Sequence, residues 1–219
     1  MEGRTHLTSQ LNEMYENILK LSALVEEALK KALAALSMGD QQLAEAVIDG
    51  DGRIDELQLA IDNHCTRMIA TEQPVAHDLR EILAAMKLST DLERIGDHAR
   101  HLARAVSIIS DSTFLPAMPD IQDMGELGVQ MVHDVTTAFV DQDADRAQEI
   151  AQRDDELDTR HRELSRKVLD IMRKNPEKMD KGMDLMFLNR FLERLGDHVT
   201  NMCEWVVFAK RGEHVELNP

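Results

Sequence analysis

Two acidic residues four positions apart occur twice in equivalent places, first as Glu93 and Asp97 and then, 100 residues later, as Glu193 and Asp197. Each pair lies in a repeated string, Glu-Arg-Ile-Gly-Asp-His in the first copy and Glu-Arg-Leu-Gly-Asp-His in the second. On a helix, residues four apart share a face, where like charges repel by about 0.2–0.5 kcal/mol. A bound cation would reverse this repulsion. The repeated pairs therefore suggest a cation site.

Each pair has a second acidic pair on the helix predicted before it. Asp51 and Asp55 precede a turn near Pro74, and a hairpin that turns there places Asp51 level with Asp97 and Asp55 level with Glu93. Further along the chain, the corresponding hairpin turns beside Pro176. The sequence thus predicts two quartets of level carboxylates, the first made by Asp51, Asp55, Glu93 and Asp97 and the second by Asp154, Asp158, Glu193 and Asp197.

Two interpretations of the quartets remain open. Carboxylates alone are hard oxygen ligands, which suit Mg, Mn, Ca or iron better than zinc. Alternatively, the acids form a solvated face that is balanced by neighbouring arginines, namely Arg53, Arg94, Arg190 and Arg194. The stretch around Asp51 does not fit a calcium loop, because Arg53 and Ile54 stand where an oxygen ligand and a glycine are needed. Nor does the chain show a phosphate-binding loop, a nucleophilic triad or the paired Glu-x-x-His motifs of a ferritin-like oxidase.

The composition predicts an all-α protein. Aromatic residues make up 3% of the 219 residues, with 10 Gly and 5 Pro, whereas helix formers abound. The formal charge of −16 argues against nucleic acids and anionic lipids as partners. No signal peptide or membrane-spanning apolar run is visible, so we expect a soluble, cytoplasmic protein without membrane insertion. Cys65 and Cys203 are expected to be buried free thiols.

Turn signals divide the chain into six amphipathic stretches. They fall at Gly39-Asp40, Pro74, Pro116–Pro119, 141–143 and Pro176, and Asp40 is a good N-cap for the second stretch. Because the second half repeats the first, we expect two tandem antiparallel three-helix bundles related by internal duplication, 1–114 and 115–219.

The third helix of each half carries both the acids and an apolar stripe that leads into them. In the last helix this stripe consists of Met179, Met183 and Met186. His98 and His198 point about 100° away from the acids and are expected at a surface or an interface. Mid-helix glycines cost about 1 kcal/mol each. We therefore expect Gly96 and Gly196 to be needed at their positions, either for a close helix contact or for room beside a metal.

The segment Gln73-Pro74-Val75-Ala76-His77-Asp78-Leu79-Arg80, together with the Glu-Arg-Ile-Gly-Asp string, resembles the PhoU family of phosphate-signalling regulators. Met131-Val132-His133-Asp134 and the second Glu-Arg string carry the same resemblance, which covers about residues 7–212. It implies two three-helix bundles and metal ions (Mg, Mn or Fe) held on the surface by both quartets. In this sequence Gly50 and Gly52 flank Asp51, and we expect them to loosen the first site.

The same resemblance implies a regulator and not an enzyme. Such a protein restrains the phosphate regulon and phosphate uptake by linking the ATPase subunit of the phosphate ABC transporter to a sensor histidine kinase. It implies a homodimer, and we expect partner contacts at Arg80, Arg94 and Arg194. The alternatives are a di-metal carboxylate enzyme, which needs ligands around an interior cavity, and a purely structural helical scaffold.

Overall fold

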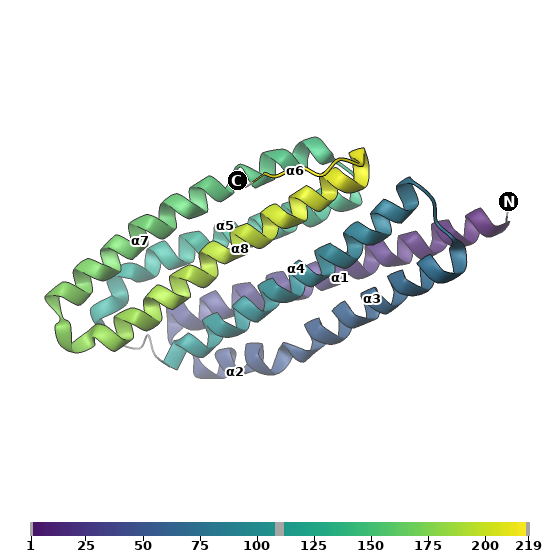
Figure 1. Ribbon diagram of the computed structural model, residues 1–219. Coiled ribbons are helices and arrows are strands. Elements are labelled where there is room, and N and C mark those ends of the chain that lie inside the picture. Colours follow the sequence, from purple (N-terminus) through teal and green to yellow (C-terminus); the bar gives the residue numbers. More distant parts are fainter. Residues whose placement is uncertain (1, 108–111, 218–219) are drawn as a thin grey trace.

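The described residues form six antiparallel helical rods, three from each half of the chain, where a rod is one long helix or two consecutive helices in line (Figure 1). The computed structural model describes residues 2–107 and 112–217, and within them the regular elements are all helical. This confirms the expected all-α class. The elements are α1 (Glu2–Met38), α2 (Gln41–Gly50), α3 (Gly52–Glu72), α4 (His77–Arg104), η1 (Ala105–Ser107), η2 (Ser112–Ala117), α5 (Met118–Val140), α6 (Ala144–Ala151), α7 (Asp154–Lys174), η3 (Pro176–Lys178) and α8 (Met179–Arg211).

Side-chain caps begin the second rod of each half. Asp40 accepts a hydrogen bond from the backbone N–H of Leu43 at 3.0 Å, as its sequence position predicts. Asp143 does the same for Arg146, also at 3.0 Å. At the other end of the second half, Gly212 ends α8 in the left-handed conformation (φ 73°) and donates to the carbonyl of Phe208 at 2.8 Å.

The second rod of each half is broken beside the first acid of its quartet, whereas the sequence pattern indicated a continuous helix. The break between α2 and α3 falls at Asp51, between Gly50 and Gly52, which are poor helix formers. The break between α6 and α7 directly precedes Asp154. At both places a backbone N–H bonds the carbonyl three residues earlier instead of four, as in a 3₁₀ turn. Ile54 N–H donates to Asp51 O, and Arg153 N–H donates to Ile150 O.

The two halves pack side by side and share one apolar core. α4 lies antiparallel to α8, α1 lies beside α5, and α3 and α7 cover the outer sides of their own halves (Figure 1). α4 buries two apolar stripes, one against its own bundle and one against the other half, with Ile82 and Leu92 both fully buried. The boundary expected between residues 114 and 115 falls inside η2 and stays a prediction.

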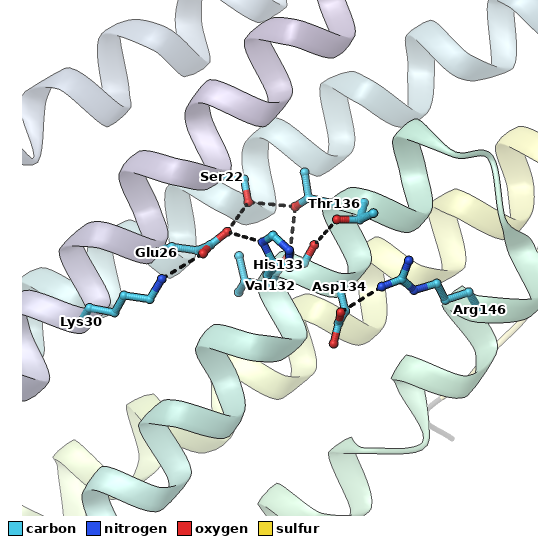
Figure 2. Close-up of polar contacts among 9 residues, drawn as sticks. Ser22, Glu26, Lys30, Val132, His133, Asp134, Thr136 and Arg146 are labelled. Carbon is cyan, nitrogen blue, oxygen red and sulfur yellow. Dashed lines mark hydrogen bonds and ion pairs between the residues drawn. The ribbon is translucent and has the colours of Figure 1, made fainter.

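A polar network also joins the halves where α1 meets α5 (Figure 2). The Oγ1 of Thr136 donates to Ser22 Oγ at 3.0 Å, and His133 Nδ1 lies 3.2 Å from an oxygen of Glu26. Glu26 also forms an ion pair with Lys30 at 3.1 Å on its own helix. The second half is thereby held to the first by polar contacts as well as by the core.

Within the described part of the chain, each helix is too short or too polar to cross a bilayer.

Candidate acidic metal clusters

The first quartet gathers between α3 and α4, and an arginine lies in it. Arg100 of α4 donates from one guanidinium nitrogen to Asp51 and from the other to Asp97. Arg94 lies 3.6 Å from Asp97 and 3.5 Å from Glu93. Asp51 is buried, Glu93 and Asp97 are half-buried, and Asp55 is exposed. The level placement that the hairpin predicted therefore brings the first four acids together.

Burial and like charges act on this quartet, and Arg100 opposes them. Burial raises the pKa of Asp51, the Arg100 charge lowers it, and Asp55 and Asp97 raise it again, so that the balance is upward. Burial also raises the pKa of Glu93, with Asp97 as the next largest cause. Like charges are thus concentrated here, but Arg100 and Arg94 are already paired with them.

The second quartet gathers between α7 and α8, and its buried acid lies against a glycine. A Cβ atom added to Gly196 would lie 2.0 Å from Oδ1 of Asp154. Gly196 therefore makes room for a carboxylate, whereas a Cβ at Gly96 would meet the apolar side chain of Ile54 at 3.0 Å. Of the two reasons expected for these glycines, Gly96 has the close helix contact and Gly196 has room in the acidic cluster.

Carboxylates dominate the electrostatics of this second quartet. Burial raises the pKa of Asp154 to about 7, and the next causes are Asp197, Asp158 and Glu193. Burial likewise raises the pKa of Glu193, followed by Asp197, while His161 and Arg190 lower it. Oε2 of Glu193 is buried and accepts no hydrogen bond from the described residues. A buried carboxylate oxygen without a donor is costly, and a cation would satisfy it.

The donor chemistry of the second quartet fits a hard divalent cation. It offers only oxygen ligands, a space that a Cβ at Gly196 would fill, and the buried oxygen of Glu193. Among the described residues, no three acidic, histidine or cysteine side chains are already arranged as a metal site. Asp154, Asp158, Glu193 and Asp197 would thus have to turn their carboxylates toward a bound ion. The ion would supply positive charge to them.

Asp134 of α5 fixes the backbone that presents Asp154. It accepts from Arg146 of α6 at 3.0 Å (Figure 2) and from Arg153, at the α6–α7 break, at 2.7 Å. Arg153 directly precedes Asp154 in the chain. In the Val-His-Asp segment of the sequence, His133 therefore contacts α1, and Asp134 binds one arginine in α6 and one at the α6–α7 break.

His98 and His198 lie at the interface between α4 and α8, one of the two locations expected for them. Their ring centroids are 5.4 Å apart, and His198 Nδ1 lies 2.8 Å from Asp91. His98 also stacks on Phe191 at 5.4 Å. The pKa of His98 is lowered to about 3, chiefly by burial and then by the charges of His198 and Arg194. These histidines belong to the joint between the halves.

The three arginines expected to contact partners differ in their surroundings. Arg80 is half-buried, and its Nε donates to the carbonyl of Ala209 at 3.4 Å, which ties the start of α4 to the end of α8. Arg94 is exposed beside the first quartet, and Arg194 is exposed on α8. Their role toward partners stays a prediction, and Arg80 has a structural contact as well.

Two features escaped the sequence reasoning. One is Arg100. Its position three residues after Asp97, on the same helix face, could have indicated the ion pair. The other is a polar network around the buried Glu81, in which Gln142, at the α5–α6 turn, donates to Glu81 and, at 3.1 Å, to Tyr15 Oη. His77 lies 2.8 Å from Glu81. The sequence carried no sign of this network, because its members come from three distant segments.

The apolar stripe expected to lead into Glu193 and Asp197 is only partly correct. Met179 and Met183 are exposed and Met186 is half-buried, so the N-terminal part of α8 does not continue the core on that side. The core face of this part of α8 is formed by Leu185, Leu188 and Leu192 instead.

This geometry defines a class of protein, an internally duplicated six-rod helical protein with one acidic quartet in each half. The chain matches the PhoU domain twice, over residues 18–106 and 121–206. It is 34% identical over 211 residues to a phosphate-specific transport system accessory protein PhoU homolog of Clostridium acetobutylicum, covering 96% of both chains. It is 31% identical to the corresponding PhoU protein of Escherichia coli, covering 95% of this chain and 88% of that one.

Solved structures agree with the sequence relatives. The crystal structure of the phosphate transport system regulatory protein PhoU from Streptococcus pneumoniae superposes with a TM-score of 0.89 at 34% identity, covering 96% of this chain and 99% of that one. PhoU from Pseudomonas aeruginosa gives 0.88 at 32%, covering 94% and 99%. The chain belongs to the PhoU family, the accessory and regulatory proteins of phosphate-specific transport, which is not a family of enzymes.

Proposed function

We propose that this protein is a metal-binding adaptor that restrains the phosphate regulon and phosphate uptake when phosphate is plentiful. In the cytoplasm it would link the ATPase subunit of the phosphate ABC transporter to the sensor histidine kinase of the phosphate two-component system. The observation that carries the proposal is the double match to the PhoU domain, with 31–34% identity to transport accessory proteins over nearly the whole chain.

The metal part of the proposal is supported by the carboxylates themselves. Two quartets of acids gather at equivalent places in the two halves, and burial and mutual repulsion raise the pKa of Asp51 and of Asp154. Folding concentrates like charge at a cost, which a bound Mg, Mn or Fe ion would offset. A purely structural scaffold would gain nothing from this arrangement. Saturable binding of Mn²⁺ to chelator-stripped protein separates the two possibilities.

Deletion of the gene tests the regulatory part. In phosphate-rich medium, transcripts of the phosphate-uptake genes should rise several-fold in the deletion strain, and the wild-type gene supplied in trans should restore repression. Unaltered repression after deletion would refute the proposal.

Copurification tests the adaptor part. The untagged protein, purified from its own host, should bring down the transporter ATPase subunit and the histidine kinase, and loss of either protein from the eluate would contradict the link. The homodimer expected from the resemblance can be checked on the same sample by light scattering.

A further inference from the structure

The two acidic quartets have different neighbours at one position of the duplicated helix. Arg100 of α4 corresponds to Thr200 of α8 at the offset of 100 that aligns the Glu-Arg-x-Gly-Asp strings. The Arg100 side chain is 27% exposed and reaches into the first quartet. Thr200 is 1% exposed, and its hydroxyl oxygen has no hydrogen-bond partner among the described residues. One half therefore has a permanent cation where the other has a small neutral side chain.

Arg100 lies where a shared cation would lie in the first quartet. Its two terminal nitrogens bind Asp51 and Asp97, which come from different helices. A metal ion placed between these helices would need the same two carboxylates. Because a guanidinium cannot lose its charge at any relevant pH, an incoming divalent ion would have to displace it against electrostatic repulsion.

The buried acids of the two quartets also lie differently. Asp51 pairs with Arg100, and the neighbour that faces Gly96 is Ile54. Asp154 instead lies against Gly196, so closely that a Cβ there would be 2.0 Å from its Oδ1. The two quartets thus surround their buried acids differently, with the Arg100 guanidinium beside Asp51 in the first and Gly196 beside Asp154 in the second.

We propose that the two quartets are not equivalent metal sites: Arg100 serves as the internal cation of the first, and divalent metal binds tightly only at the second, formed by Asp154, Asp158, Glu193 and Asp197. This inference rests on the metal part of the proposed function. It assigns to Arg100 the role of blocking the first site, and it makes α7 and α8 the metal-dependent part of the molecule.

The arrangement has a structural consequence for regulation. Loss of metal would leave the α3–α4 pair unchanged, because Arg100 holds Asp51 and Asp97 together without it. The α7–α8 pair would lose the cation that offsets its carboxylates. Metal would therefore alter the second half selectively.

Mn²⁺ titration of the chelator-stripped full-length protein, followed by the electron paramagnetic resonance signal of free Mn²⁺, tests the proposal. The wild type should show one class of tight binding, which Glu193→Gln with Asp197→Asn weakens at least about tenfold and Glu93→Gln with Asp97→Asn leaves unchanged. If both double variants lost Mn²⁺ affinity equally, the inference would be overturned, but the metal part of the proposed function would stand. Absence of any saturable binding to the wild type would overturn both the inference and the metal part of the proposed function.

Replacement of Arg100 gives the complementary test. Arg100→Thr, which copies the residue of the second half, should add a second class of tight Mn²⁺ sites and so raise the stoichiometry. Arg100→Gln removes the charge but keeps amide donors for Asp51, so it serves as a second test if Arg100→Thr misfolds. Circular dichroism would report misfolding of either variant. Crystals grown with Mn²⁺ should show anomalous density only at the second quartet in the wild type and at both quartets in the variant. Unchanged stoichiometry in both folded variants, or wild-type density at the first quartet, would refute the assignment.

Discussion

Gly196 of α8 and Asp154 of α7 lie so close together that a single methyl group on the glycine would come within 2.0 Å of the aspartate Oδ1. The equivalent glycine of the first half, Gly96, faces Ile54 and not an acid. The glycine of the repeated string is therefore used for two different purposes. In the second half it allows a buried carboxylate to approach the helix that carries Glu193 and Asp197.

The first prediction concerns this contact. Gly196→Ala should displace the Asp154 carboxylate and weaken Mn²⁺ binding about 10–100-fold, the usual effect of moving a group that orients metal ligands. Its effect on stability should be small, because the gain of about 1 kcal/mol in helix propensity offsets part of the clash. Isothermal titration calorimetry and urea unfolding measure the two quantities. Gly96→Ala is the matched control and should leave Mn²⁺ binding unchanged; an equal loss in both variants would contradict the contact's role.

The second prediction concerns the pH dependence that Asp154 imposes on stability. Its pKa is raised from 3.8 to about 7, so between these values the folded protein keeps a proton that the unfolded chain loses. The metal-free wild type should therefore lose stability from this group as the pH rises from 4 to 7. Asp154→Asn should be more stable than the wild type by about 1–2 kcal/mol at pH 8 and about equal at pH 4. Urea unfolding in the presence of chelator checks this, and parallel pH profiles would refute it.

The third prediction has the opposite sign and concerns His98. Burial lowers its pKa from 6.5 to about 3, so below pH 6.5 the unfolded chain binds a proton that the folded protein refuses. Neither ring nitrogen has a hydrogen-bond partner among the described residues, so little is lost by replacing the ring with an apolar side chain. His98→Leu should be more stable than the wild type by about 1–2 kcal/mol at pH 5, with the advantage gone by pH 8. An advantage that is the same at both pH values would argue against a neutral buried imidazole.

The fourth prediction concerns the network that ties the α5–α6 turn to α4. Glu81 is buried, and it accepts a hydrogen bond from Gln142 and lies 2.8 Å from His77. Glu81→Ala leaves these groups without their acceptor and should cost about 1–3 kcal/mol of unfolding free energy. Glu45→Ala, at an exposed position on α2, is the control and should change stability by less than about 0.5 kcal/mol. Equal effects in urea unfolding would show that the network contributes no stability.

Local signals in the sequence were sufficient to predict the rods, their turns and the grouping of the acids. Turn residues such as Pro74 and Pro176 set the hairpins, and helical periodicity then placed Asp51 level with Asp97. Helix α4 packs against the helices of its own bundle and also against α8.

What could not be predicted depends on side-chain direction and on contacts between distant segments. The pairing of Arg100 with Asp51 requires the distance between α3 and α4, which no local pattern encodes. The ion pair between Arg153, beside the break before Asp154, and Asp134 of α5 likewise joins residues that no local pattern links. Met179 and Met183 are exposed at the start of α8, and periodicity alone does not say where along a helix its packing partners end.

The most direct test of the central claim is the metal content of the untagged protein isolated from its own host without chelator. Elemental analysis should find at least one Mg, Mn or Fe ion per chain in the wild type and a loss of that metal in the Glu193→Gln, Asp197→Asn variant. The variant Glu45→Gln, Asp49→Asn removes the same two acids at the same spacing from an exposed face of α2 and should retain the metal. A wild-type protein without metal, or a double variant at the second quartet that keeps its full complement, would contradict the claim that these carboxylates hold a cation.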